Sequence, residues 1–197
     1  MTPIRFMRYE EEPSIVKGLR WLCEYLLAQK LRRPLVMYEV GTCAGEAAEV
    51  FARYFDEVHC IDVFDSSCGG NLSPYTWAEI EESFDQRAWI AGNIHKHKGL
   101  SEHLATDVED QSLYFVYIDA GHSYAEVTKD LQAWIPKVKP GGWIGGHDFN
   151  YSQPGVTRAV MEAFPGSAIQ GNNVFHFQDG NPIRIFHDSS WLVRKED

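Results

Sequence analysis

Two short segments carry the side chains whose types and spacing could do chemistry. Asp119 follows one apolar run of the chain, and His147 and Asp148 follow another. Carboxylates are typical ligands of hard divalent cations, and imidazole is a typical ligand of softer ones. If the two runs are neighbouring strands that end at the same level, these three side chains converge and could hold a divalent cation. His122 stands three positions after Asp119 in the same polar stretch.

Purely structural interpretations of these side chains also stay open. His122 and Ser123 stand just before a helical pattern and could cap that helix. His147 could instead hydrogen-bond a carbonyl of its own loop.

A glycine pair marks a second place where a ligand could bind. Gly41 and Gly45 lie directly after an apolar run and directly before a helical pattern. Since glycine has no Cβ, a ligand can approach the backbone of such a turn closely. Asp62 comes 21 positions after Gly41, at the end of the next apolar run, where a carboxylate can accept both hydroxyls of a ribose. The two signals together predict a nucleoside-containing cofactor.

The turn is not typical of a dinucleotide site. Dinucleotides favour a third glycine, which lets the pyrophosphate meet a helix N-terminus, whereas here Glu39 precedes the first glycine. The motif Glu39-x-Gly-x-x-x-Gly resembles the first motif of class I S-adenosylmethionine-dependent methyltransferases, and the resemblance extends from about residue 35 to about residue 150. It implies that S-adenosylmethionine is bound by Glu39, Gly41, Thr42, Cys43, Gly45, Asp62, Val63, Gly99, Leu100, Ser101 and Asp119.

A narrower resemblance concerns the polar segments. The stretch 119–124, Asp130, the sequence Lys-Pro-Gly-Gly at 139–142 and the pair 147–148 are similar to small sugar and macrolide O-methyltransferases. For metal-dependent members, this implies Asp119, His147 and Asp148 as ligands of Mg²⁺ or Mn²⁺ and His122 as the general base. It makes His122, Asp119 and Asp148 the candidate catalytic residues. His147 departs from the pattern, because an oxygen ligand is usual there, and this leaves a softer cation or no cation as alternatives.

The resemblance implies in-line transfer of a methyl group from a sulfonium to an oxygen of a hydroxylated small molecule. His122 would take the hydroxyl proton, and a cation would lower the pKa of that hydroxyl. Three alternatives stay open: a metal-independent small-molecule methyltransferase, a cofactor-binding domain without catalysis, and a nicotinamide-dependent oxidoreductase.

Alternating apolar runs and helical patterns must position these segments. Strands are predicted at 34–40, 58–62, 94–98, 113–119, 143–144, 174–177, 183–186 and 191–193, and helices at 13–30, 46–54, 77–89, 125–134 and 157–164. The alternation predicts an α/β fold, doubly wound and Rossmann-like, with a mostly parallel seven-stranded sheet and helices on both faces. We expect one domain over 1–197, with a helical extension (1–33), a cofactor-binding core (34–150) and C-terminal strands (151–197).

The amino-acid composition limits which binding partners and which cellular location we expect. The net charge of −10 leaves no basic surface for a nucleic acid, so we expect a small-molecule acceptor and no nucleic acid. No apolar run approaches the about 18 residues that a membrane span needs, and no signal peptide is expected. The four cysteines form no Cys-x-x-Cys pair, which favours a reduced cytoplasm. The first helix is a candidate lid or homodimer contact.

One further segment, in which histidines alternate with lysines, has no role in these assignments. His95 and His97 alternate with Lys96 and Lys98 on a short predicted strand. We interpret them as a solvated face, with a ligand site as the alternative.

Overall fold

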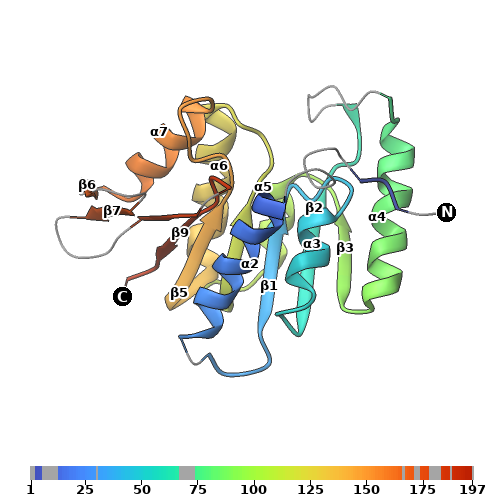
Figure 1. Cartoon of the computed structure of the whole chain (residues 1–197), viewed down its shortest axis with the longest axis horizontal. Coiled ribbons are helices and arrows are strands. Elements are labelled where there is room, and N and C mark those ends of the chain that lie inside the picture. The colour runs from blue at the N-terminus through green and yellow to red at the C-terminus, as the bar shows by residue number, and fades with distance from the viewer. Residues whose placement is uncertain are drawn as a thin grey trace.

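One large sheet runs through the protein, and five of its strands are parallel (Figure 1). The computed structural model describes residues 3–5, 13–29, 31–66, 74–165, 167–170, 174–177, 183–186 and 188–196. Neighbouring strands run parallel in the order β3-β2-β1-β4-β5. Their bounds are β1 (Val36–Val40), β2 (Glu57–Asp62), β3 (Ile94–Lys98), β4 (Leu113–Ile118) and β5 (Val138–Gly146).

Antiparallel strands continue the sheet beyond β5. The order there is β9-β8-β7-β6, with β6 (Ser167–Gln170), β7 (Val174–Phe177), β8 (Ile183–Ile185) and β9 (Trp191–Arg194). The Rossmann-like fold class is confirmed. The sheet of the described residues has nine strands, whereas a seven-stranded sheet was expected and eight strand ranges were predicted along the chain. Of these nine strands only β6 lies outside the predicted ranges, and it pairs with β7 as an antiparallel hairpin at the sheet edge.

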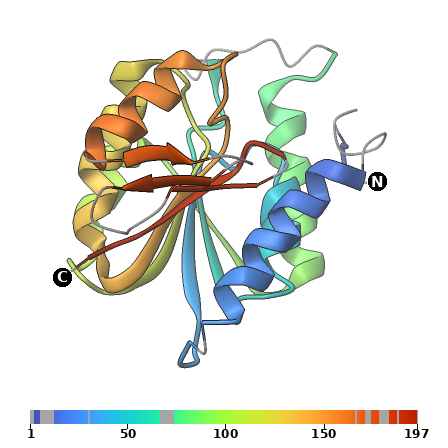
Figure 2. The same ribbon diagram turned by 60° about the vertical axis from the view of Figure 1, so that its left-hand side comes forward.

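Helices cover both faces of the sheet (Figure 2). Helices α2 (Pro13–Leu27), α3 (Glu46–Phe51) and α4 (Trp77–Ala91) lie on one face, and α5 (Ser101–Leu104), α6 (Tyr124–Trp134) and α7 (Pro154–Ala163) on the other. Strand residues alternate between the two layers: Met37 and Phe115 pack in the core beneath α2–α4, whereas Val116 and Ile144 pack beneath α6 and α7. Single 3₁₀ turns, η2 (Ala105–Asp107) and η3 (Ile135–Lys137), follow α5 and α6.

Two elements of the structure differ from what the sequence predicted. The short helix α5 was not predicted, because Ser101–Leu104 is too short to show a helical period. Strand β5 is longer than the predicted 143–144, since pairing with β4 resumes at Val138 across a register shift that takes up Pro140–Gly142. Among the residues that the structure describes, no helix is long and apolar enough to cross a bilayer.

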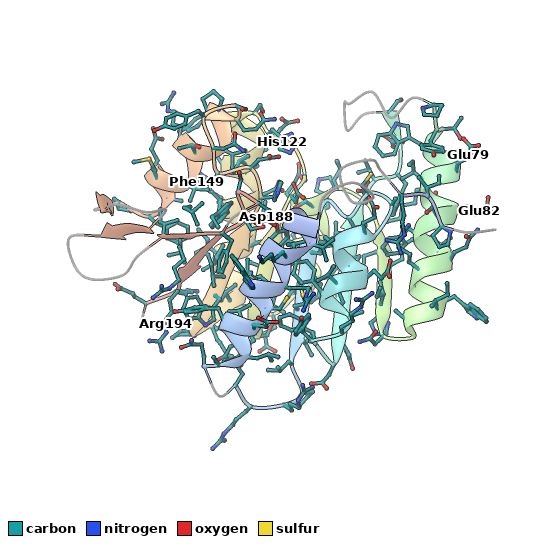
Figure 3. All side chains as sticks on the ribbon, viewed as in Figure 1. Glu79, Glu82, His122, Phe149, Asp188 and Arg194 are labelled. Carbon is teal, nitrogen blue, oxygen red and sulfur yellow. The ribbon has the colours of Figure 1, made fainter. Side chains whose placement is uncertain are left out.

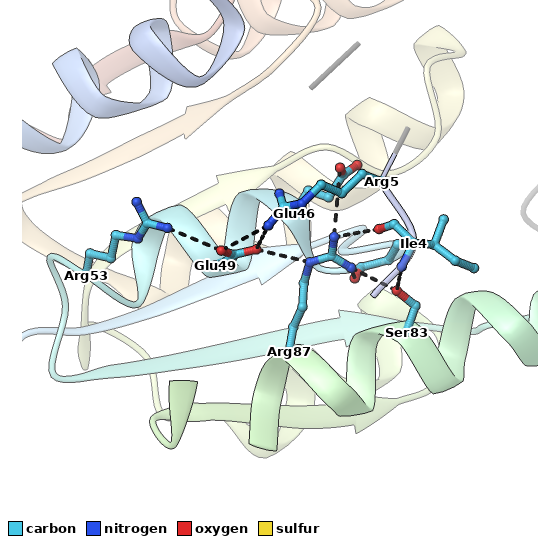
Figure 4. Close-up of polar contacts among 8 residues, drawn as sticks. Ile4, Arg5, Glu46, Glu49, Arg53, Ser83 and Arg87 are labelled. Carbon is cyan, nitrogen blue, oxygen red and sulfur yellow. Dashed lines mark hydrogen bonds and ion pairs between the residues drawn. The ribbon is translucent and has the colours of Figure 1, made fainter. Parts of the chain in front are cut away.

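Arg87 ties the start of the chain to α3 and α4 (Figure 4). Its guanidinium is 2% exposed and lies 3.3 Å from Glu49 and 3.9 Å from Glu46. It also donates hydrogen bonds to the Ser83 hydroxyl and to the backbone carbonyls of Ala44 and Ile4. One buried cation therefore holds together segments that are far apart in the sequence.

Replacing this cation is expected to destabilise the fold. Arg87→Met keeps the side chain's length but removes the buried cation and its contacts with Glu46 and Glu49, which costs about 3–5 kcal/mol for a buried ion pair. Arg53→Ala is the matched control, since Arg53 also contacts Glu49 but is 65% exposed, and we expect about 0–1 kcal/mol. Urea unfolding followed by circular dichroism measures both free energies. Equal losses in the two variants would contradict this account.

Candidate active site

The glycine turn lies where the strand order reverses. β1 stands between β2 and β4, so the loops after β1 and β4 diverge and leave a crevice at the carboxyl ends of the strands. Gly41 and Gly45 have φ angles of 87° and 82°, which favour glycine. A Cβ on Gly41 would lie 2.3 Å from the backbone oxygen of Asp119. Only glycine therefore lets this turn pass beside the end of β4.

Asp62, at the end of β2, is hydrogen-bonded to the backbone of the glycine turn. Its Oδ2 accepts a hydrogen bond from the backbone N–H of Cys43 at 2.8 Å, and its Oδ1 accepts one from Phe64 at 2.9 Å. Carboxylate oxygens each have capacity for more than one hydrogen bond. Asp62 can therefore hold the turn in shape and still accept ligand hydroxyls.

A cavity of about 500 Å³ opens in front of the turn. This volume lies in the range of small-molecule and cofactor sites, about 300–1,000 Å³. Eight of the residues predicted to bind the cofactor line it, namely Gly41, Cys43, Asp62, Val63, Gly99, Leu100, Ser101 and Asp119. These come from the ends of four neighbouring strands, β1, β2, β3 and β4, and from the segments that follow them.

Glu39, Thr42 and Gly45 do not line the cavity. Strand alternation turns Glu39 away from it, toward the layer of α2–α4, where the side chain is 1% exposed. Its carboxyl accepts hydrogen bonds from the Thr42 hydroxyl at 2.7 Å and the Cys60 thiol at 3.4 Å. Burial raises the pKa of Glu39 to about 8. In this structure these three residues contribute to the shape of the turn.

This buried carboxyl predicts a pH-dependent stability. The folded pKa of Glu39, about 8, lies above its ordinary value of 4.5, so the folded state prefers the protonated form. The contribution is fully present below about pH 4.5 and is lost as the pH rises through 8, with an upper limit of about 5 kcal/mol. Glu39→Gln can keep the hydrogen bond from Thr42 and cannot ionise. We expect the free energy of unfolding in urea to fall for the natural protein, relative to the Glu39→Gln protein, as the pH rises from 5 to 9. Parallel plots of the two free energies against pH would contradict this prediction.

Several lining residues were not among the predicted site residues, and the most informative are Trp77 and Asp130, of which Asp130 had entered only as part of the family resemblance. Asp130 lies on α6 between Val127 and Trp134 on the buried face of that helix, and burial raises its pKa to about 6. A carboxylate in the apolar stripe of a predicted helix was the available signal. The neighbouring Ser101 hydroxyl accepts a hydrogen bond from the Trp134 indole at 2.8 Å.

The polar cluster after β4 and β5 forms as expected from the strand ends. Ile118 of β4 pairs with Gly146 of β5, so Asp119 and His147 leave the sheet at the same level. The Nε2 atom of His122 lies 3.0 Å from Asp148 Oδ2 and 3.7 Å from Asp119 Oδ1. Asp148 has a φ of 59°, a left-handed conformation that Asp tolerates better than most residues. Figure 3 shows His122 at this end of the sheet, above Asp188.

The structure groups a different histidine with the carboxylates than the sequence indicates. Asp119, His122 and Asp148 each offer a ligand atom within 4.8 Å of the others. His147 lies outside this group: its Nδ1 is 3.3 Å from Asp148 Oδ1, without the alignment of a hydrogen bond, and its ring is largely buried. Ser123, and not His122, caps α6, in a reciprocal pair with Glu126. His122 is therefore free of the capping role.

Mutual contacts dominate the charge states of the cluster. The carboxylates of Asp119 and then Asp148 raise the pKa of His122 to about 10. Burial alone would lower the pKa of His147, but Asp148 raises it to about 9. Burial would raise the pKa of Asp148, yet the two imidazoles hold it well below its ordinary value. At neutral pH, His122 is an imidazolium between two carboxylates.

A family comparison identifies the class of protein. Residues 38–149, more than half of the chain, match the sequence profile of the family described as "Methyltransferase domain". The chain belongs to this family and is a class I S-adenosylmethionine-dependent methyltransferase. A search of curated proteins gives no match.

Solved structures with this fold act on different acceptors. The TDP-rhamnose 3'-O-methyltransferase CalS11 of calicheamicin biosynthesis is 18% identical, with a TM-score of 0.59 over 90% of this chain and 79% of that one. An rRNA methylase from Streptococcus thermophilus is 13% identical, with a TM-score of 0.60 over 91% and 97%. A phosphoethanolamine N-methyltransferase from Haemonchus contortus, in complex with S-adenosylhomocysteine, is 15% identical, with a TM-score of 0.52 over 96% and 47%. At these identities the likeness shows the fold alone.

Proposed function

We propose that this methyltransferase transfers the methyl group of S-adenosylmethionine to a hydroxyl oxygen of a small molecule. One observation carries the proposal: the cavity in front of the glycine turn is continuous with the polar cluster, since Asp119 and His122 line the same space as Gly41 and Asp62. A cofactor seated on the turn would thus have the acid–base groups beside it. Methyl transfer needs this proximity, because it requires an in-line approach of donor and acceptor.

The cavity wall offers partners for each part of the cofactor. Asp62 would accept the ribose hydroxyls, and Gly41 would let the methionine part approach the backbone. Leu100 and Ser101, which follow β3, would lie against the adenine, with Trp77 available as a flat apolar neighbour. In this proposal, Glu39 and Thr42 support the turn from behind.

The carboxylate pair fits a divalent cation. Asp119 and Asp148 present oxygens to one point, and the His122 imidazolium now occupies that point as their positive partner. Two carboxylates with an imidazole at hand suit Mn²⁺ better than Mg²⁺, which prefers an all-oxygen shell. A bound cation would supply Lewis-acid assistance, lowering the pKa of an acceptor hydroxyl and relieving His122 of its role as counter-charge.

His122 would accept the proton. S-adenosylmethionine would supply the methyl group: its carbon–sulfur bond would break as the hydroxyl oxygen bonds to the methyl carbon, and neutral S-adenosylhomocysteine would leave. The hydroxyl proton would pass to Nδ1 of a neutral His122, whose Nε2–H faces Asp148 and Asp119 and is oriented by them. Because the two carboxylates raise the pKa of His122 to about 10, His122 can be this base only when other positive charge offsets them.

A small acceptor fits the charge of the protein. With a net charge of −10 the chain offers little attraction to a polyanion, which sets the proposed acceptor apart from the substrate of the rRNA methylase neighbour. The polar cluster is also only partly exposed, with Asp119 and Asp148 side chains at 16% and 19%.

We further propose one domain over 1–197 working in a reduced cytoplasm, where the buried Cys23 and Cys60 stay as thiols. A homodimer stays a prediction.

Cofactor binding and cation dependence can be tested separately. Calorimetry with S-adenosylhomocysteine tests the turn, and methyl transfer from labelled donor to a panel of glycosides, sugar nucleotides and phenols tests the acceptor class. We expect chelation to abolish transfer and Mn²⁺ to restore it. Asp148→Asn should lower kcat about 100-fold or more while changing cofactor affinity little. Asp110→Asn, at an exposed carboxylate paired with Lys137, is the matched control and should behave as the natural protein.

Each result bears on a different part of the proposal. Transfer that survives both chelation and Asp148→Asn would remove the cation and favour the metal-independent alternative. Methylation of RNA, with none of the small molecules accepted, would contradict the acceptor class. A folded protein that binds no S-adenosylhomocysteine would contradict the proposal as a whole.

A further inference from the structure

A second cluster of metal-type ligands lies on β2 and β3, away from the cavity. Glu57 and His59 alternate along β2, so their side chains share one face of the sheet. His95 of the edge strand β3 pairs in register with His59, which places the two imidazoles side by side on that face. One ligand atom from each of Glu57, His59 and His95 lies within 4.8 Å of the other two.

The His59 ring is held in one orientation. It stacks on Tyr38 of β1, with ring centroids 4.6 Å apart and planes 8° from parallel. Its Nδ1 lies 2.9 Å from Nε2 of His97, and its Nε2 lies 3.4 Å from Glu57. Metal-binding histidines characteristically use the second ring nitrogen in such a hydrogen bond, which fixes the tautomer and aims the other nitrogen. Here the nitrogen left for a ligand is the one that faces Glu57.

Neighbouring charges leave the imidazoles available. Lys96 and Lys98 alternate with the histidines and therefore point to the opposite face, where they pair with Glu81 and Asp85 of α4. No lysine therefore competes with an ion for the histidine face of β2 and β3. The solvated face expected from the sequence describes only part of this strand, since the His59 side chain is 19% exposed.

The short helix α5 explains why these side chains can be reached. α5 has four residues, Ser101–Leu104, and the helix that covers this layer next, α6, reaches Tyr38 through Trp134, with ring centroids 5.4 Å apart. Glu57 and His95 lie beyond that cover and are exposed. Because two of the three side chains are exposed, an ion can reach the group from solvent.

We propose that Glu57, His59 and His95 bind a divalent transition-metal ion of the Zn²⁺ type, with His97 orienting His59. Two imidazoles and one carboxylate are a common donor set for Zn²⁺ and Co²⁺, with bonds of about 2.0–2.2 Å, and are a poor set for Mg²⁺ or Ca²⁺. The site is separate from the cavity, because Glu57 begins β2 and Asp62 ends it, roughly 16 Å away along the strand. The bound ion cross-links the edge strand β3 to β2.

The experiment uses the full chain with the active-site carboxylate already removed. In an Asp148→Asn background, Zn²⁺ is titrated in competition with a chromophoric chelator, and Co²⁺ is titrated by its visible absorption. We expect one equivalent of Zn²⁺, a tetrahedral-type Co²⁺ spectrum, and a melting temperature that rises with Zn²⁺ concentration. Adding His95→Ala should remove all three signals, and His97→Ala should weaken Zn²⁺ binding about 10- to 100-fold.

His103→Ala is the matched control, because His103 is an exposed histidine on α5 outside the cluster. It should leave affinity and spectrum unchanged. His95 is exposed, so His95→Ala should fold, which circular dichroism checks. Zn²⁺ affinity that is equal in the His95→Ala and His103→Ala proteins would overturn the proposal. So would the absence of any Zn²⁺ binding in the folded Asp148→Asn protein. Neither result depends on methyl transfer, so the proposed function is tested independently.

Discussion

A Gly41→Ala protein is expected to fold but to bind S-adenosylhomocysteine at least about 100-fold more weakly than the natural protein. Two effects add at this position. The φ of 87° costs alanine about 1–2 kcal/mol, and the new Cβ would lie 2.3 Å from the backbone oxygen of Asp119, which cannot rotate away as a side chain could. Relief requires the turn to move away from the end of β4, and that movement changes the floor of the cavity. Calorimetry gives the affinity, and thermal unfolding gives the stability.

Gly92→Ala separates the two effects. Gly92 ends α4 with a φ of 79°, yet a Cβ there meets nothing within 4 Å. This variant should lose the same 1–2 kcal/mol of stability and keep its cofactor affinity. If Gly41→Ala bound the cofactor as tightly as Gly92→Ala does, the turn would not be the cofactor's seat.

His122→Ala is expected to lower kcat about 10²- to 10⁴-fold, the range typical of a general base, with cofactor affinity within a few-fold of the natural protein. The imidazole contacts both Asp148 and Asp119 and lines the cavity, whereas His147, the other histidine beside Asp148, does not line it. Single-turnover methyl transfer to the best acceptor of the panel measures the chemical step.

His103→Ala again serves as the control, since it removes an exposed imidazole elsewhere. A base should change kcat far more than the KM for the acceptor, and the residual activity of His122→Ala should rise with pH as hydroxide or the free alkoxide takes over. An unchanged kcat would assign His122 a purely electrostatic role between the carboxylates.

The sequence predicted the frame of the site because short-range patterns determine it. Alternation and glycine placement located the ends of β1, β2 and β4, and the register of β4 with β5 then brings Asp119 beside Asp148. The choice of histidine could not be predicted in this way. Which of His122 and His147 faces the carboxylates depends on the left-handed backbone of Asp148 and on loop packing, and neither has a local sequence signature.

Features that depend on tertiary contacts were also not predicted. Glu39 was expected to face the cofactor, but strand alternation turns it into the core, where the Thr42 hydroxyl and the Cys60 thiol donate to it. The pairing of His59 with His95 joins residues 36 positions apart, and nothing in either segment alone indicates the other. Strand β6 escaped prediction because its four residues gain their structure from β7.

The contacts of Arg87 link the glycine turn beside the cavity to a distant segment near the start of the chain. The same guanidinium holds the carbonyl of Ala44, inside the glycine turn, and the carbonyl of Ile4, near the start of the chain. Because one side chain holds both, we expect ordering of the turn to favour ordering of the chain at Ile4, and this coupling must act equally in both directions. An occupied turn should therefore slow amide exchange and protease cleavage around Ile4, so that the opening segment reports remotely on whether the enzyme is loaded.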